Sequence, residues 1–221
     1  MFSWEPKIFD ISPLISERTA VFPGDVAFAR NVSMSFAQGH HLGLSDIRTT
    51  LHIGAHADAP SHYDAHGCAI ANRDLRYYLG PCQVIQVAIP RGSRILPKDL
   101  NGVAIGAPRV LLRTDSFIDP DRWCDDFNSL SPELVDYLAD RNVITIGIDT
   151  PSVDPADSKM LEAHAALKRR DVANLEGLWL TDTPAGQYFL SALPLRIEGA
   201  DASPVRAVLF GQGSGKLSST I

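Results

Sequence analysis

The sequence predicts an α/β fold: a mixed, β-rich core with a few helices in a single domain. Short apolar runs rich in β-branched residues recur along the 221 residues and are bounded by turn residues, as strands are. No Gly/Ser linker, charge block or repeat divides the middle of the chain, and its 45% hydrophobic and 21% charged residues give a globular composition. We expect one domain over residues 1–210 and a flexible C-terminal tail over residues 211–221.

The strands are predicted from apolar or alternating segments. The clearest alternation covers residues 46–53, where the odd positions share one face and the even positions, ending at His52, form a polar face. Pro23-Gly24 marks a turn before it. The expected strands are residues 8–12, 32–36, 46–53, 82–89, 109–114, 143–149, 175–180, 190–195 and 205–210.

Helices are fewer than strands. Ser131 is a suitable N-cap and Pro132 suits the first helical position, so a helix is predicted from there to Arg141. A second helix is expected over residues 158–170, with three consecutive basic residues in its last turn, where cations suit the helix dipole. A short third helix is expected over residues 72–79.

Charge and composition exclude several classes of partner. The formal net charge is −6 and Lys and Arg are scattered, so no nucleic-acid footprint is expected. No run approaches the 18 apolar residues of a membrane span, and residues 1–10 do not resemble a secretory signal. The three cysteines, Cys68, Cys82 and Cys124, are an odd number without zinc-motif spacing. Reduced thiols in a cytoplasmic protein are therefore expected.

Histidines are concentrated in one segment. Between residues 52 and 62, Gly54 lets the chain bend and approach other backbone closely. His56 and Asp58 point to the same side if the segment is extended. Imidazole and carboxylate are ligands that suit zinc and manganese, whereas four such groups converging without a metal would need many hydrogen bonds. Six of the seven histidines lie in this region: His40, His41, His52, His56, His62 and His66.

The remaining histidine and one acid are candidate ligands farther along the chain. His164 lies on the second predicted helix, and Glu176 stands among apolar residues in a predicted strand, where burial is costly unless the acid is paired or metal-bound. Spacing alone leaves open a surface histidine and an edge-strand acid. His40, His41 and His66 fall outside the pattern, and we favour surface positions for them over a pocket-lining role.

Residues 52–62 resemble the signature of the metal-dependent cyclase family, His-x-Gly-Thr-His-x-Asp-x-Pro-x-His, and depart from it only at Ala55. Within that family, the chain is most similar to the bacterial kynurenine formamidase branch. The supporting stretches are residues 10–13, 23–25, 147–155, 157–159, 175–177, 193–196 and 201–205, so that the resemblance extends over nearly the whole chain.

The resemblance implies a swivelling β/β/α fold, a homodimer and two divalent metal ions per subunit, usually zinc and sometimes manganese. By similarity, Asp58 belongs to both ion sites, Asp58 and Glu176 can bridge, and His62 is the catalytic acid/base and not a ligand. The implied ligands are His52, His56 and Asp58 for one ion and Asp58, His164 and Glu176 for the other.

The activity implied is hydrolysis of N-formyl-L-kynurenine to L-kynurenine and formate in tryptophan degradation. Phe22 stands where these enzymes usually have a tryptophan that packs on the aromatic substrate, so it offers a smaller π-face without an N–H. Ala55 lacks a hydroxyl that could support a neighbouring ligand. The alternatives are another amide hydrolase of this family, such as one that opens isatin, and a non-catalytic metal-binding protein.

Overall fold

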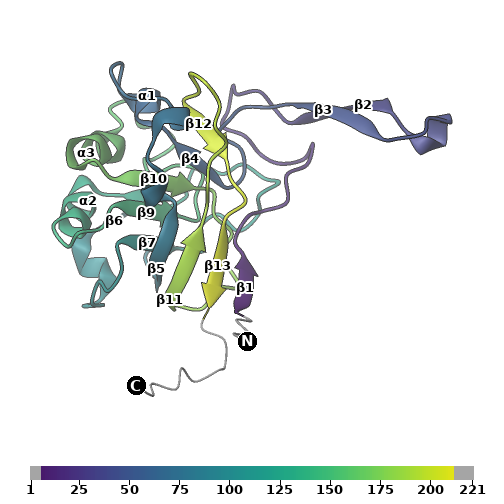
Figure 1. Cartoon of the computed structure of the whole chain (residues 1–221). Coiled ribbons are helices and arrows are strands. Elements are labelled where there is room, and N and C mark those ends of the chain that lie inside the picture. The colour runs from purple at the N-terminus through teal and green to yellow at the C-terminus, as the bar shows by residue number, and fades with distance from the viewer. Residues whose placement is uncertain (1–5, 212–221) are drawn as a thin grey trace.

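A nine-stranded curled sheet forms the centre of the molecule in the computed structural model, which describes residues 6–211 (Figure 1). Its middle four strands are parallel and its outer pairs antiparallel. In spatial order the strands are β1 (Lys7–Asp10), β13 (Val208–Gly211), β11 (Gly186–Ser191), β5 (Leu79–Gln86), β7 (Arg109–Arg113), β9 (Thr145–Ile148), β10 (Ala173–Glu176), β4 (His56–Asp58) and β12 (Ala202–Pro204).

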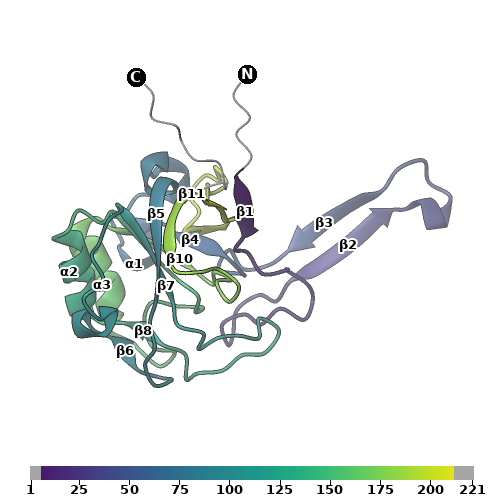
Figure 2. The ribbon, with the colours of Figure 1, turned by 90° about the horizontal axis from the view of Figure 1, so that it is seen from below.

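Two helices, α2 (Pro132–Ala139) and α3 (Glu162–Arg170), cover one face of this sheet (Figures 1 and 2). The start of α2 is as expected, because Ser131 accepts a hydrogen bond from the Leu134 amide and Pro132 follows it. Apolar side chains of both helices form one core with the facing strands, and a second core fills the other face of the sheet. The predicted mixed, β-rich fold with few helices is confirmed.

Two smaller sheets and several short helices complete the described chain. The strands β6 (Arg94–Ile95) and β8 (Ser129–Leu130) pair beside the helices, and β2 (Ala29–Met34) pairs with β3 (Leu44–Arg48) in a hairpin that projects from the body (Figure 2). The short helices are α1 (Pro60–Tyr63) and the 3-10 helices η1 (Phe36–Gln38), η2 (Ile70–Asn72), η3 (Leu75–Tyr77) and η4 (Pro97–Leu100).

The predicted strand over residues 46–53 is wrong in its second half. The ladder between β3 and β2 ends at the pair Arg48–Ala29, and Gly54 has a φ of 56°, so His52 lies in a turn rather than at a strand end. The alternation of apolar and polar residues predicted β3 correctly. It could not show that β2, the partner of β3, begins only at Ala29. The helix expected over residues 72–79 is replaced by 3-10 turns, and Leu79 already begins β5.

Other boundaries shift for tertiary reasons. The second helix begins at Glu162 and not at residue 158, because the Asp154 carboxylate accepts from the amides of Ala163 and His164. The strand expected over residues 175–180 ends at Glu176, and those expected over residues 190–195 and 205–210 are instead β11 and β13. Gly211, assigned to the tail, is the last residue of β13, and the rest of the predicted tail lies outside the described residues.

Membrane-spanning helices can be assessed over residues 6–211. Within that part of the chain, no helix combines the length and the apolar character needed to cross a bilayer.

Candidate metal centre

Neighbouring strands of the sheet bring His56 and Asp58 of β4 next to Glu176 of β10. His56 and Asp58 are two residues apart on this short strand, which lies between β10 and β12. The antiparallel register places Glu176 directly opposite His56, and the His56 Nε2 atom lies 3.2 Å from the Glu176 Oε2 atom. Residues 120 positions apart therefore meet as a cross-strand pair.

The turn before β4 adds the third side chain. The His52 Nδ1 atom lies 2.9 Å from the Asp58 Oδ1 atom. This turn packs closely against the residue that follows β10. A Cβ at Gly177 would lie 2.1 Å from the Gly54 carbonyl oxygen, so only glycine fits there. That same carbonyl accepts a hydrogen bond from the His56 Nδ1 atom at 2.9 Å. Donation by Nδ1 leaves the lone pair of Nε2 directed into the cluster.

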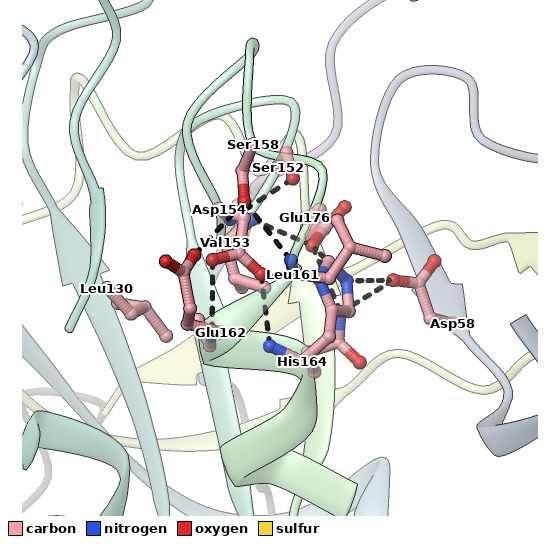
Figure 3. Close-up of polar contacts among 12 residues, drawn as sticks. Asp58, Leu130, Ser152, Val153, Asp154, Ser158, Leu161, Glu162, His164 and Glu176 are labelled. Carbon is pink, nitrogen blue, oxygen red and sulfur yellow. Dashed lines mark hydrogen bonds and ion pairs between the residues drawn. The ribbon is translucent and has the colours of Figure 1, made fainter. Parts of the chain in front are cut away.

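His164 reaches the cluster from the first turn of α3 (Figure 3). Its Nε2 atom lies 3.3 Å from the Asp58 Oδ2 atom and 3.5 Å from the Glu176 Oε1 atom. Its Nδ1 atom donates to the Asp154 Oδ2 atom at 2.9 Å. Asp154 thus caps the helix and fixes the orientation and tautomer of the imidazole, which is the role of a carboxylate behind a metal-binding histidine.

Amide groups of the chain hold the two buried carboxylates in place. The Asn174 side chain donates to the Asp58 Oδ2 atom at 2.7 Å and to the Glu176 Oε1 atom at 3.0 Å. The Val153 amide also donates to the Glu176 Oε1 atom, at 2.9 Å. The amide-bound oxygens, Asp58 Oδ2 and Glu176 Oε1, face His164, and the other oxygen of each acid faces His52 or His56.

The buried polar atoms of the cluster fit a divalent cation. The His56 Nε2 and Asp58 Oδ1 atoms are buried and have no hydrogen-bond partner among the described residues. His52 lies close to that Asp58 oxygen, but the geometry is not that of a hydrogen bond. Uncompensated buried atoms of this kind are costly, and a cation coordinated by them removes the cost. Among residues 6–211, candidate ligand atoms lie within 4.8 Å of one another in three groups: His52, His56 and Asp58; His52, His62 and Asp201; Asp58, His62 and His164.

The charges of the cluster favour a positive occupant. Burial lowers the pKa of the His52 imidazole, but the carboxylates of Asp58 and Asp201 outweigh it and raise that pKa to about 9. Burial also lowers the pKa of His164, but the carboxylates of Asp154, Asp58 and Glu176 outweigh it and hold that pKa well above the usual value. Burial likewise raises the pKa of Asp58, yet the adjacent imidazoles of His164 and His52 hold it well below its ordinary range. Two buried acids therefore attract either protons on the imidazoles or a metal.

Metal loading of the metal-free protein is expected to release protons. Because the pKa of His52 is raised to about 9, its ring is protonated in metal-free protein at pH 7 and must lose that proton to bind a cation. The apparent affinity should rise by roughly tenfold per pH unit for each proton displaced, and level off above pH 9. Calorimetric titration of zinc in buffers of different ionisation enthalpy measures this, and a pH-independent affinity from pH 6 to pH 9 would contradict it.

His62 and an aromatic pocket lie beside the cluster. The His62 ring centroid is 4.2 Å from that of His52 and 5.8 Å from that of His164, and a third of its side chain is exposed. The Asp201 Oδ2 atom lies 3.6 Å from the His62 Nδ1 atom. The adjoining pocket is lined by the apolar residues Phe22, Phe117, Trp123, Leu178 and Trp179 together with His52 and His56.

Phe22, the residue predicted to pack on the substrate, is part of this pocket. It lines the pocket and packs edge-on against Trp123, with ring centroids 5.1 Å apart. Phe117 lines the same pocket and lies 6.1 Å from the Trp123 ring. Two tryptophans, Trp123 and Trp179, therefore line the pocket, although residue 22 is a phenylalanine.

The structure brings the predicted site residues together. The six predicted ligand and acid/base residues form one cluster, and Phe22 lies in the adjoining pocket. The open alternatives for His164 and Glu176 are wrong, because their exposures are 2% and 3% and β10 is paired on both sides. His40 and His41 lie beyond β2 in the projecting hairpin, and His66 is exposed after α1, so these three are not part of the cluster.

Four further residues at the site were not predicted from sequence: Asp154, Asn174, Asp201 and Trp123. Asn174 had a usable signal, since it stands two positions before Glu176 on one strand and therefore shares its face. Asp154 and Asp201 lie within stretches that carry the family resemblance, but nothing in their spacing links them to a histidine. Trp123 reaches the pocket through a long loop, for which no periodicity exists.

Asp154→Asn is expected to lower metal affinity by about 10–100-fold, because the amide no longer fixes the His164 tautomer. Zinc titration of metal-free protein measures the change. Glu162→Gln is the matched control: Glu162 is the other carboxylate bound by Arg94, but it is exposed and does not contact His164. Equal affinities for the Asp154 variant and the parent protein would contradict the role of Asp154.

Comparisons with known proteins agree with this geometry. The family model described as "Putative cyclase" matches residues 9–155. A protein of Bordetella petrii named kynurenine formamidase is 47% identical over 204 residues, which is 92% of this chain and 97% of that protein. A solved structure described as a potential metal-dependent hydrolase with cyclase activity has a TM-score of 0.81 at 27% identity, covering 95% of this chain and 100% of the other.

Isatin hydrolase A from Labrenzia aggregata shares the fold, with a TM-score of 0.78 at 22% identity and coverage of 94% of each chain. The resemblance found in residues 52–62 and in the stretches around them is confirmed by the identity of the formamidase relatives over most of the chain. This chain belongs to the cyclase family and, within it, to the branch of the kynurenine formamidases.

Proposed function

We propose that this protein is a metal-dependent arylformamidase that hydrolyses N-formyl-L-kynurenine to L-kynurenine and formate. One observation carries the proposal: buried histidines and carboxylates converge beside His62 at the base of an aromatic pocket, in a chain 47% identical to a relative named kynurenine formamidase. The pocket suits an aryl ring, and the cluster beneath it suits the formyl group that must be attacked.

Two divalent ions per subunit are proposed, with zinc expected and manganese as the alternative. His52, His56 and Asp58 would hold one ion, and Asp58, His164 and Glu176 the other. The unpartnered His56 Nε2 and Asp58 Oδ1 atoms support the first ion, and the similar structure described as a potential metal-dependent hydrolase supports a metal in general. When bound, such ions lower the pKa of water and draw electrons from a carbonyl oxygen, which is the chemistry that amide hydrolysis requires.

His62 is proposed to move the proton. The leaving group is an aniline nitrogen, which must gain a proton as the C–N bond breaks, and the attacking water must lose one. A partly exposed imidazole beside the cluster can take the proton from water and return it to nitrogen. Asp201, close to the His62 Nδ1 atom, favours the tautomer whose Nε2 atom accepts the proton.

The aromatic pocket is proposed to bind the substrate ring between Phe22, Phe117 and Trp123. Trp123→Ala is expected to lower kcat/KM for formylkynurenine by about 10–100-fold, chiefly through KM, because edge and face contacts of a large ring are lost. Phe22→Trp, which installs the residue usual in this branch, should retain activity. Steady-state kinetics of both variants test the assignment, and an unchanged KM in Trp123→Ala would contradict it.

A homodimer in the cytoplasm is also proposed. The three cysteines are unpaired, which agrees with the reducing compartment expected from their number and spacing. No nucleic-acid or membrane partner is expected, given the net charge of −6 and the scattered Lys and Arg residues.

The decisive test is turnover of formylkynurenine and isatin by protein of known metal content. We expect kcat/KM for formylkynurenine to exceed that for isatin by at least about a hundredfold, and chelator-treated protein to hydrolyse neither. The reverse preference would favour an isatin-opening enzyme, for which the smaller Phe22 ring is the argument. Full metal occupancy without hydrolysis of either compound would favour a non-catalytic metal-binding protein.

A further inference from the structure

Asp149, a buried acid, lines the aromatic pocket and has no cation beside it. The residue is 6% exposed, and among residues 6–211 no lysine, arginine or histidine forms an ion pair with it. Burial raises its pKa to about 6, and hydrogen bonds from Thr114 and from two backbone amides offset only part of that rise. A buried acid of this kind is costly to the fold, so its place in a pocket points to a role there.

The strand order determines which segment Asp149 meets. The strands β7 and β9 are parallel neighbours with Leu112 opposite Ile148, so the residues that follow them emerge at one edge of the sheet (Figure 1). Glu176, at the end of the parallel strand β10, lies at the same edge. Because β9 lies between β7 and β10, Asp149 stands between the metal centre and the loop after β7, called the wall loop here (residues 114–128).

Asp149 holds the start of the wall loop with three hydrogen bonds. Its Oδ2 atom accepts from the amides of Thr114 and Asp115, each at 2.8 Å, and its Oδ1 atom accepts from the Thr114 hydroxyl at 2.7 Å. Asp115 has a φ of 53°, which is disfavoured for a residue with a Cβ, and the hydrogen bond from its amide stabilises this conformation. Since hydrogen bonds to a carboxylate are the strong ones, Asp149 fixes the direction in which the loop leaves β7.

The same network extends to the end of the wall loop. The Thr114 hydroxyl shares a hydrogen bond of 2.8 Å with the Ser116 hydroxyl, which accepts from the Asn128 amide at 2.9 Å. The Asn128 side chain in turn donates to the Pro90 carbonyl at 2.6 Å. Ser116 and Asn128 are 2% and 1% exposed, so water has little access to these bonds. Asp149 therefore begins a chain of hydrogen bonds that closes the base of the loop.

The wall loop supplies much of the aromatic lining of the pocket. Phe117 and Trp123 belong to it, and both rings also pack against Phe127, with centroids 6.3 Å and 5.9 Å apart. The loop contacts a second part of the lining, because the Pro120 carbonyl accepts from the Ala20 amide at 2.8 Å. Opening the base of the loop would therefore displace the aromatic lining and leave the metal ligands in place.

We propose that Asp149 is a positioning residue that clamps the wall loop and so sets the aromatic pocket for the aryl ring of the substrate. In this role the carboxylate acts through the loop and does not contact the reacting atoms. The kinetic consequence rests on the proposed function, because it concerns an aryl formamide bound in this pocket. The clamp itself does not depend on that function.

The kinetic test compares three variants. Asp149→Ala should raise KM for formylkynurenine by about 10–100-fold and change kcat by less than about threefold, with the zinc content of the parent protein. Asp149→Asn should recover most of that loss, since its oxygen can accept from both amides and its NH2 group can donate to the Thr114 hydroxyl oxygen. Asp119→Ala is the matched control and should leave KM unchanged, because Asp119 is an exposed acid of the same loop.

Hydrogen exchange measured by mass spectrometry tests the clamp without turnover. In zinc-loaded protein, peptides of the wall loop should exchange at least about tenfold faster in Asp149→Ala than in the parent, and Asp149→Asn should remain close to the parent. Thr114→Val removes only the hydroxyl contact and should give an intermediate rate. It replaces Asp149→Ala in the comparison if that variant does not fold.

Three results would decide against parts of this account. Parent-like exchange of the wall loop in folded Asp149→Ala, or in Thr114→Val where it replaces that variant, would overturn the clamp. Equally raised KM values in Asp149→Ala and Asp149→Asn would overturn the positioning role and indicate direct contact between the carboxylate and the substrate. Faster exchange in Asp149→Ala together with a zinc-loaded parent protein that does not hydrolyse formylkynurenine would reject the proposed function and support the clamp.

Discussion

His62→Ala is expected to retain its metal and to lose most of its rate, with kcat falling by about 10²–10⁴-fold, the usual contribution of a positioned acid/base. The structure supports this division of roles. The His62 side chain is 33% exposed, whereas those of His56 and His164 are 2% exposed. A group that exchanges protons with water and substrate needs that access, and a structural ligand does not.

The same geometry would also allow His62 to be a metal ligand, so the experiment distinguishes two roles. The ring nitrogens of His62 can join two of the three groups of atoms close enough to share an ion. Elemental analysis must therefore accompany the kinetics. Metal lost in proportion to activity would make His62 a ligand and refute its role as the acid/base. His66→Ala is the control, because His66 is exposed and outside the cluster, and that variant should match the parent protein in both measurements.

The pH profile separates a proton-transfer role from a structural one. The parent enzyme should show a pH-dependent limb of kcat that arises from the group transferring the proton, and His62→Ala should lose that limb while keeping residual activity. A variant whose residual activity follows the parent profile in shape would indicate that another group transfers the proton.

Local chemistry made much of the metal site predictable from sequence. His56 and Asp58 alternate on a strand, and a bend at Gly54 gives the turn room to bring His52 back to them. The distant partners were harder to predict. That Glu176 lies opposite His56 depends on the register of two strands, which sequence patterns fix only where one face is polar.

The errors in the fold prediction have the same cause. Helix α3 begins late because Asp154, outside the helix, satisfies its first amides, and no propensity in residues 158–161 reports that contact. The strand ending at Glu176 stops because Gly177 must approach the Gly54 carbonyl. The hairpin of β2 and β3 was predicted as two ordinary strands, since alternation describes exposed hairpins as well as buried sheets.

Asp58→Asn is expected to have the largest effect on metal content, with both ions lost and activity reduced by at least about 10³-fold. The Asp58 side chain is fully buried, and imidazoles of His52, His56 and His164 surround it. Removing one member of a buried charged set typically costs about 3–5 kcal/mol, or about two to four orders of magnitude in affinity. The asparagine oxygen can still accept from Asn174, but its NH2 group would then replace the Oδ1 atom that faces His52 and His56, and an NH2 group cannot bind a cation.

Glu176→Gln provides the graded comparison, since Glu176 would serve as a ligand to only one of the two proposed ions. This variant should lose about one ion per chain and keep the other, because the glutamine oxygen can still accept from Val153 and Asn174. Elemental analysis after identical zinc loading and desalting measures the zinc content per chain. We expect this content to be highest in the parent protein, lower in Glu176→Gln and lowest in Asp58→Asn. Full occupancy in Asp58→Asn would refute the shared ligand, and with it the two-ion centre, since no other carboxylate of the cluster lies within reach of all three imidazoles.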